Sequence, residues 1–221
     1  MFGSIGSPIV MRYRRMNGIR FLGVFCYCFS IVPGMGAPEA FPGIDALIRE
    51  KPVIRCSYSQ TRYLTDFNRE LQSGGEVVIA RDVGVLWKQR EPFSMTIVVE
   101  QDQLWQVFPN RAPQRMDAGG SSPLGQLNTL FLALLTVDVE ALLSHFTVEV
   151  ESWDPCAWAM ELHPRSEPMQ GLLESIQVRG GAFVEYICIQ DAEGNRTEIR
   201  FHSVEDEPEA LRAEERKLFG R

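Results

Sequence analysis

The spacing of apolar and polar residues changes several times along the chain, and each change predicts a different element. Apolar residues recur at helical spacing in FPGIDALIREKP, so we expect a short amphipathic helix that ends before Pro52. Strict alternation follows in VIRCSYSQTRYL and indicates a strand. Further strand patterns follow in GEVVIA, VLWKQR, SMTIVVE and QDQLWQVF, with turn signals at 82–84 and 101–102. The first half of the chain is therefore expected to form an antiparallel meander.

A loop and a strongly apolar segment interrupt the strand patterns. Residues 109–123 are rich in Pro, Gly, Ser and Asn, which predicts a loop. Residues 124–135, LGQLNTLFLALL, would form a helix that is apolar around almost its whole circumference, and such a helix must be buried on more than one side. A second helix is expected in VDVEALLSHF, with Asp138 as its N-cap.

Strand patterns resume after this helical insertion. We expect strands in FTVEVES, CAWAMELH, SIQVRG, FVEYICIQ and TEIRFHS, with the turn DAEGN before the last of them. Residues 205–221 form a charged tail, which we expect to be a loosely attached helix. The resulting fold class is mainly β with α, with one strongly curved antiparallel sheet and its helices on one side.

The central strands carry large apolar residues on both faces. One predicted set is Trp87, Met95, Ile97, Val99 and Trp105, and the opposite set is Leu86, Val98, Leu104 and Val107. Since an ordinary antiparallel sheet has only one dry face, the inner face of a curled sheet could wrap the helix at 124–135. Two interpretations stay open. A permanently packed helix would make a plain core, and a helix that swings out would be a lid over a lipid-sized cavity.

The first 36 residues have the pattern of a secretory signal peptide. Four arginines precede the apolar run FLGVFCYCFSIV, and the small residues Gly34 and Gly36 follow it. A membrane-spanning helix would need about 20 apolar residues. We therefore expect export and cleavage near Gly36, with an uncleaved membrane anchor as the alternative.

Composition and charge narrow the classes of partner. The chain has 221 residues and is 45% hydrophobic, which is enough for one sizeable core. Residues 1–36 hold four of the 22 Lys and Arg and none of the 29 Asp and Glu, so the exported part has a net charge of −11. So acidic a chain is poorly suited to a phosphate backbone, and we expect no nucleic-acid partner.

Motifs for catalysis, metal binding and nucleotide binding are missing from the sequence. There is no GxSxG, HExxH or GxxxxGK, and His145, His163 and His202 are too scattered to suggest a metal set. A meeting of His163 and His202 across strands is the less favoured alternative. The cysteines of the exported part are interpreted as buried strand residues, with one disulfide as the alternative; they are Cys56, Cys156 and Cys188. We expect no enzymatic activity, no metal and no cofactor.

Several short motifs occur in an order that resembles one known family. A short helix leads into SYSQTR, and then come GEVVIARDVGVLWKQREPF, DQLWQVFPN, SPLGQL opening a helix, and the hairpin DAEGNRTEIRF. In this order, from Pro38 to Ser203, the chain resembles the periplasmic outer-membrane lipoprotein carrier protein LolA family. The resemblance implies that residues 37–204 form an incomplete antiparallel β-barrel with a helical lid over an apolar cavity.

The resemblance also implies a function and its partners. It indicates a monomeric periplasmic carrier that takes acylated lipoprotein or lipid cargo from an inner-membrane lipoprotein-releasing ABC transporter to an outer-membrane receptor. The alternative function is a non-transporting periplasmic β-rich protein-interaction module. By strand alternation and helical composition, we expect these residues to line the cavity: Tyr58, Trp87, Met95, Ile97, Val99, Trp105, Leu127, Phe131 and Leu134.

One charged residue has an expected role in gating. In the family, an arginine just after the strand tryptophan fastens the lid, and Arg90 has a similar position, three residues after Trp87. The family places that arginine directly before a proline, whereas here Glu91 separates Arg90 from Pro92. A surface ion pair is the alternative role for Arg90.

Overall fold

The computed structural model describes residues 51–100, 103–116, 133–135, 139–154, 157–205 and 207–220. All of these residues belong to one compact unit, Gly43–Arg221. The predicted signal peptide and the predicted helix before Pro52 lie outside the described residues, as do residues 117–132. None of the described helices is long and apolar enough to cross a membrane.

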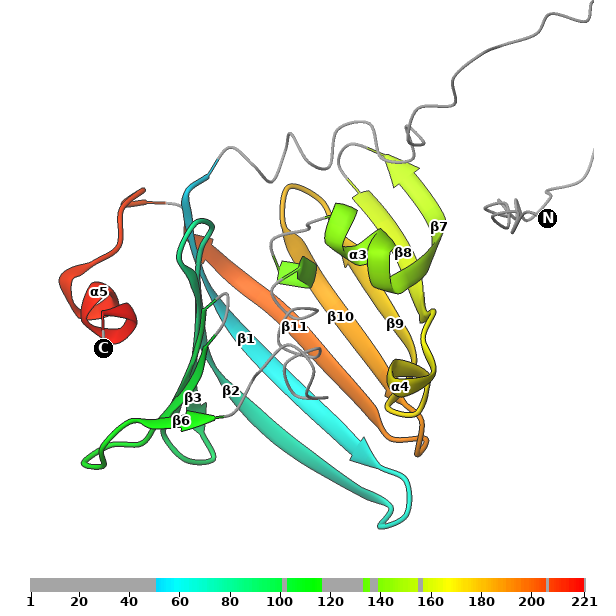
Figure 1. Ribbon diagram of the computed structural model, residues 1–221, viewed down its shortest axis with the longest axis horizontal. Coiled ribbons are helices and arrows are strands. Elements are labelled where there is room, and N and C mark those ends of the chain that lie inside the picture. The colour runs from blue at the N-terminus through cyan, green and yellow to red at the C-terminus, as the bar shows by residue number, and fades with distance from the viewer. Residues whose placement is uncertain are drawn as a thin grey trace, which may run out of the picture. The chain divides into compact units, whose positions relative to one another are not determined.

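Two meanders build one antiparallel sheet with the strand order β6-β5-β4-β3-β2-β1-β11-β10-β9-β8-β7. The first meander consists of β1 (Val53–Leu64), β2 (Arg69–Ala80), β3 (Gly84–Glu91), β4 (Met95–Val99), β5 (Leu104–Val107) and β6 (Gln114–Met116). The second consists of β7 (Phe146–Asp154), β8 (Ala157–Pro164), β9 (Leu173–Gly180), β10 (Val184–Asp191) and β11 (Arg196–Glu205). Antiparallel pairing of β1 with β11 joins the two meanders. The sheet is strongly curved, and its edge strands β6 and β7 do not pair with each other, so the predicted open, curved antiparallel sheet is confirmed (Figure 1).

The local sequence pattern predicted most strands well. Strands β2 and β6 differ from the prediction. Strand β1 has the bounds of its alternating segment. Strand β2 begins at Arg69, earlier than expected, because its first residues extend the hairpin with β1 as far as the pair Leu64 and Arg69. Strand β6 lies in the predicted loop. It has only three residues, too few for alternation to be visible, and it exists through its pairing with β5.

The described helices lie on both sides of the sheet. Helix α3 (Val139–His145) begins directly after Asp138, where a helix was predicted. The helical residues 133–135 and α3 lie on the concave side, α5 (Ala213–Phe219) lies on the convex side, and the short α4 (Glu167–Gln170), which was not predicted, precedes β9 (Figure 1).

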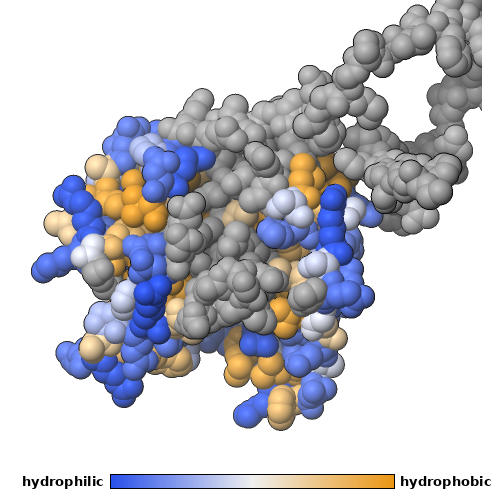
Figure 2. All heavy atoms as spheres, viewed as in Figure 1, coloured by the Kyte–Doolittle hydropathy of each residue, from blue (hydrophilic) through white to orange (hydrophobic). Residues whose placement is uncertain are grey.

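Each face of the curved sheet has its own hydrophobic cluster. The larger one, on the concave side, contains Cys56, Tyr58, Val77, Val85, Trp87, Val99, Leu104, Ala133, Leu134, Leu135, Leu142, Phe146, Trp158, Met160, Leu162, Met169, Leu173, Ile176, Val178, Val184, Ile187, Ile199 and Phe201. The smaller one consists of Val53, Val78, Ala80, Leu86 and Val98, and Trp105, Val107, Leu211, Leu218 and Phe219 pack against it. The C-terminal segment therefore covers the second apolar face of the central strands. In Figure 2, hydrophilic residues make up most of the visible outline, and apolar residues are visible in several patches between them.

The C-terminal helix is anchored to the sheet, and the prediction of a loosely attached tail is wrong. Arg55 Nε and Nη2 donate to the carboxylate of Glu215 at 2.8 and 2.7 Å, and both residues are buried. The same guanidinium donates to the carbonyl oxygens of Pro208 and Ala210 at 2.8 and 2.9 Å. Nothing in the local sequence pattern of the tail indicates this partner, because Arg55 belongs to the first strand.

Candidate functional site

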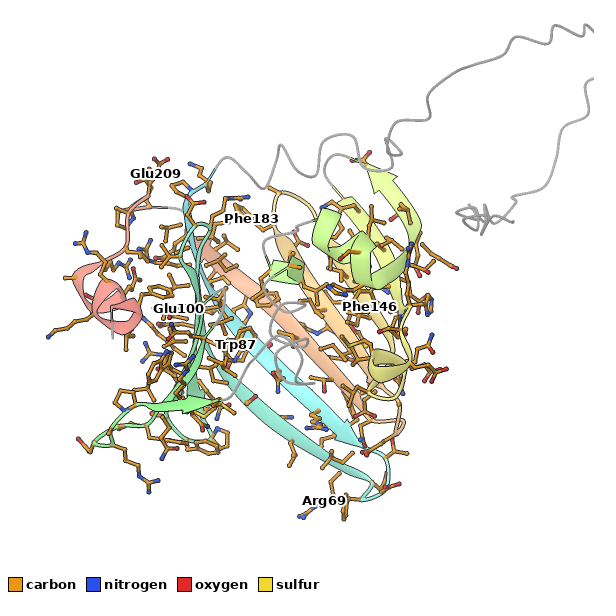
Figure 3. All side chains as sticks on the ribbon, viewed as in Figure 1. Arg69, Trp87, Glu100, Phe146, Phe183 and Glu209 are labelled. Atoms are coloured by element: carbon orange, nitrogen blue, oxygen red, sulfur yellow. The ribbon has the colours of Figure 1, made fainter. Side chains whose placement is uncertain are left out.

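Three aromatic side chains from separate strands meet on the concave face. The ring centroids of Tyr58 on β1 and Trp87 on β3 lie 4.2 Å apart. Phe201 on β11 meets Trp87 edge-on at 6.1 Å. Trp87 and Phe146, from opposite halves of the sheet, project toward the inner side (Figure 3) and belong to one buried cluster. The curvature therefore directs large apolar groups of both meanders into one space.

A glycine lies on the strand between Tyr58 and Trp87. Gly75 on β2 pairs with Tyr58 across the ladder, on the strand between β1 and β3. A Cβ atom at Gly75 would collide with the carbonyl oxygen of Lys88. The absence of a side chain at this residue lets the backbones of β2 and β3 approach each other next to the aromatic pair.

The titratable groups on this face are kept neutral. Burial raises the pKa of the Cys56 thiol to about 12, so the thiol is protonated and poorly nucleophilic at neutral pH. Burial also raises the pKa of the Tyr58 hydroxyl to about 12, while the Trp87 side chain acts in the opposite direction. Among the described residues, the buried charged side chains are Arg55 and Glu215, which lie on the convex side. Among the described residues, the buried part of the concave face thus offers apolar contact and no charge.

The concave face is densely filled in this conformation. Ala133, Leu134 and Leu135 are each at most 5% exposed and belong to the concave cluster. The cavity that borders Leu135 and Phe201 measures about 20 Å³, which is room for little more than a water molecule. Sites for drug-sized ligands have volumes of roughly 300–1,000 Å³. A lipid tail could therefore enter only if some of the packed side chains moved away.

A larger groove of about 710 Å³ is open to solvent, and most of the residues that line it are polar. Hydroxyl and amide side chains of β1 and β2, among them Thr61 and Gln72, line it together with Arg90 at the end of β3. Arg90 Nη2 donates to Glu76 Oε1 at 2.7 Å, and both side chains are exposed. This is the surface ion pair that was the alternative for Arg90. Its role in gating a lid stays a prediction.

The structure brings most of the predicted cavity residues to one face. Tyr58, Trp87, Val99 and Leu134 belong to the concave cluster, and Ile97 packs against it. Met95 lies outside the cluster, is half-buried, and its Sδ accepts a hydrogen bond from Gln106 Nε2 at 2.8 Å. Leu127 and Phe131 lie outside the described residues. Whether any of these residues binds a ligand stays a prediction.

Trp105 is placed on the opposite face from the one predicted. Strand β5 pairs Leu104 with Val99 and Trp105 with Val98. Leu104 therefore joins the concave cluster and Trp105 packs against the convex one, so these two residues exchange places relative to the prediction. A shift of one residue moves a side chain to the other face, and alternation within so short a strand does not determine which face is inner.

The second meander also contributes to this face, which was not predicted from the sequence. Trp158, Met160, Ile176, Ile187 and Phe201 are buried in the concave cluster. Their alternation with polar residues was visible in CAWAMELH, SIQVRG, FVEYICIQ and TEIRFHS, but the pairing of β1 with β11 that places them beside Tyr58 was not.

The histidines and cysteines considered for catalysis or metal binding do not form a site among the described residues. His163 on β8 and His202 on β11 are separated by β9 and β10, so the suggestion that they meet across strands is wrong. The described residues include no group of three or more His, Cys, Asp or Glu that could hold a metal ion. Cys56 and Cys188 are free thiols, and Cys156 lies outside the described residues.

One family model matches the chain. Residues 52–214 match the family model described as "Outer membrane lipoprotein carrier protein LolA". Similar solved structures include a LolA superfamily protein from Nitrosomonas europaea, with 13% identity, 80% of this chain and 93% of that chain covered, and a TM-score of 0.43. A DUF1329 family protein from Desulfovibrio piger has 11% identity, with 76% and 90% covered and a TM-score of 0.45. The Pseudomonas aeruginosa MucA/MucB complex has 11% identity, with 78% and 57% covered and a TM-score of 0.44. No curated protein sequence matches the chain.

Proposed function

The chain belongs to the outer membrane lipoprotein carrier protein LolA family, and on that premise we propose that it carries acylated lipoproteins, or a related lipid, through the periplasm from the inner to the outer membrane. The acyl chains would lie against the concave face of the sheet. In this proposal the protein is an exported monomer without catalytic activity. An inner-membrane ABC transporter delivers the cargo, and an outer-membrane receptor accepts it.

The buried apolar cluster of the concave face, in which no described residue is charged, is the observation that supports this function. Each methylene exposed to water costs about 0.8 kcal/mol, so a carrier of two or three acyl chains must cover tens of them. The concave cluster supplies apolar side chains from both meanders and no buried charge. Broad aromatic rings such as Trp87 and Phe201 provide contact area for chains of variable shape.

Release of cargo requires that the side chains packed on the concave face, such as those of residues 133–135, can be displaced for little free energy. The small volume of the present cavity is consistent with an empty carrier in which residues 133–135 occupy the space of the cargo. The same observation favours the second candidate, an interaction module in which this packing is permanent. Only binding measurements separate the two candidates.

Native mass spectrometry of the exported protein, followed by extraction of bound material, tests the proposal. We expect a co-purifying acylated species, or a mass increase after incubation with a triacylated lipopeptide. Ile97→Glu, which puts a charge against the concave cluster, should abolish the mass increase, whereas Thr96→Glu, next to it on β4 and directed to the other face, should not. Thermal melts of both variants show whether they remain folded. An apo mass that never changes would support the interaction module.

A further inference from the structure

The Tyr58 hydroxyl is an unusual group for an apolar interior. The residue is only 2% exposed, and within the described part of the chain no acceptor receives its Oη–H proton, because the neighbouring Trp87 side chain can only donate to this hydroxyl. Buried hydroxyl groups are nearly always paired, since an unpaired one loses its hydration without compensation. An orphaned donor at the centre of the concave face is therefore a candidate contact for a ligand.

Tyr58 also marks a boundary along β1. Along the side of β1 that faces the concave side, Cys56 and Tyr58 are buried, Gln60 is half-buried and Arg62 is exposed. Gln60 pairs with Ser73 on β2, so polar side chains follow directly after the aromatic contact. An acylated molecule has the same sequence of properties, with an apolar tail, then an ester or amide carbonyl, then a polar head.

The protonation state of Tyr58 makes it a donor. Because burial raises the pKa of its hydroxyl to about 12, the proton is present at every physiological pH. The concave cluster has no buried cation, and Arg62, the nearest arginine along β1 on this face, is exposed and pairs with Asp191 at 3.7 Å. A neutral carbonyl oxygen suits this environment better than the ionised carboxylate of a free fatty acid, which would need a buried cation.

We propose that Tyr58 Oη donates a hydrogen bond to the ester or amide carbonyl oxygen that joins an acyl chain to its head group, and so fixes how deeply the tail enters the concave face. The inference rests on the proposed carrier function. It adds to that function a specificity for acyl linkages over plain hydrocarbon or ether-linked chains. The aromatic contact with Trp87 holds the Tyr58 ring in place.

A comparison of ester and ether ligands tests the inference. The probes are a peptide carrying a dipalmitoyl-glyceryl-cysteine and its dihexadecyl ether counterpart, which lacks both ester carbonyls. Isothermal titration of the wild-type protein should show about tenfold tighter binding of the ester, the size expected for one hydrogen bond. Tyr58→Phe should bind both probes with the affinity that the wild-type protein has for the ether. Tyr63→Phe, on the same strand and the other face, should keep the preference.

The possible outcomes separate this inference from the carrier function. Equal binding of ester and ether by the wild-type protein, or a preference that survives in Tyr58→Phe, would overturn the role of Tyr58 and leave the carrier function standing. A wild-type protein that binds neither probe would overturn both. The thermal stability of ligand-free Tyr58→Phe gives a further check, because removal of an unpaired hydroxyl should not lower it. A clear fall would show that the hydroxyl has a structural partner, and would also overturn the inference.

Discussion

Arg55 and Glu215, 160 positions apart in the chain, form a bidentate ion pair with N–O distances of 2.8 and 2.7 Å. Arg55 lies on β1 between Ile54 and Cys56, and Cys56 belongs to the concave cluster. The strand that contributes to the candidate binding face therefore also anchors the C-terminal helix on its other side. A helix of seven residues is not stable in isolation, so α5 depends on this pair and on the apolar contacts of Leu218 and Phe219.

Removal of one partner of this pair should strongly destabilise the protein. Glu215→Ala leaves the Arg55 guanidinium buried without its counter-charge, and we expect the free energy of unfolding to fall by about 3–5 kcal/mol. Urea denaturation followed by circular dichroism measures this change. The neighbouring Glu214 is exposed, and Glu214→Ala should change the stability by less than about 0.5 kcal/mol. Similar losses in the two variants would contradict the anchoring role. The double variant Arg55→Met, Glu215→Met should recover much of the loss.

Acid should weaken the anchoring of α5 through the same carboxylate. Burial alone would raise the pKa of Glu215, but hydrogen bonds from Arg55 and from the Arg212 backbone hold it below the ordinary value of 4.5. A lowered pKa in the folded state gives stability that is fully present above the ordinary pKa and is lost as the pH falls through the lower value. In urea denaturation from pH 7 to pH 3, the difference in stability between wild type and Glu215→Gln should be constant down to about pH 5 and shrink below it. If the difference stayed constant down to pH 3, the pKa of Glu215 would be the same in the folded and unfolded states, contrary to this prediction.

Gly75 should tolerate no side chain. A Cβ there would collide with the Lys88 carbonyl oxygen, whereas a Cβ at Gly74 would lie 3.2 Å from the Tyr58 carbonyl oxygen. We expect Gly75→Ala to cost at least about 2 kcal/mol more than Gly74→Ala, because β2 and β3 must move apart to accept it. Chemical denaturation of the two variants checks this comparison. If the two costs were equal, the close approach of β2 and β3 would not be needed for stability.

The two tryptophans of the central strands should differ in function. Trp87 lies in the concave cluster and Trp105 packs against the convex one. Trp87→Ala is expected to weaken binding of a triacylated lipopeptide at least tenfold, through the loss of roughly 1.5–3 kcal/mol of apolar contact. Trp105→Ala should leave the affinity within about twofold and reduce the stability of the α5 contact instead. Isothermal titration together with thermal melts measures both effects. Equal losses of affinity would mean that the two faces are not independent.

Most strands could be predicted because their signals are local. Alternation over twelve residues gave the bounds of β1, and the turn at Asp191–Asn195 separates β10 from β11 as expected, with Gly194 at a φ of 84°. The order of short motifs also led to the family that the match over residues 52–214 shows. These features depend on neighbours in the chain, since periodicity and turn chemistry act over a few residues.

By itself, the sequence determined that this protein has an antiparallel, two-meander sheet with apolar residues on both faces of its central strands. Only the tertiary structure decided which face is which. The register of β4 with β5 sent Leu104 inward and Trp105 outward, the pairing of β1 with β11 brought Phe201 beside Tyr58, and Arg55 recruited the C-terminal helix to the convex face. Such contacts join residues far apart in the chain. Their energies depend on how all the strands of the sheet pair with one another, and no short stretch of sequence carries that information.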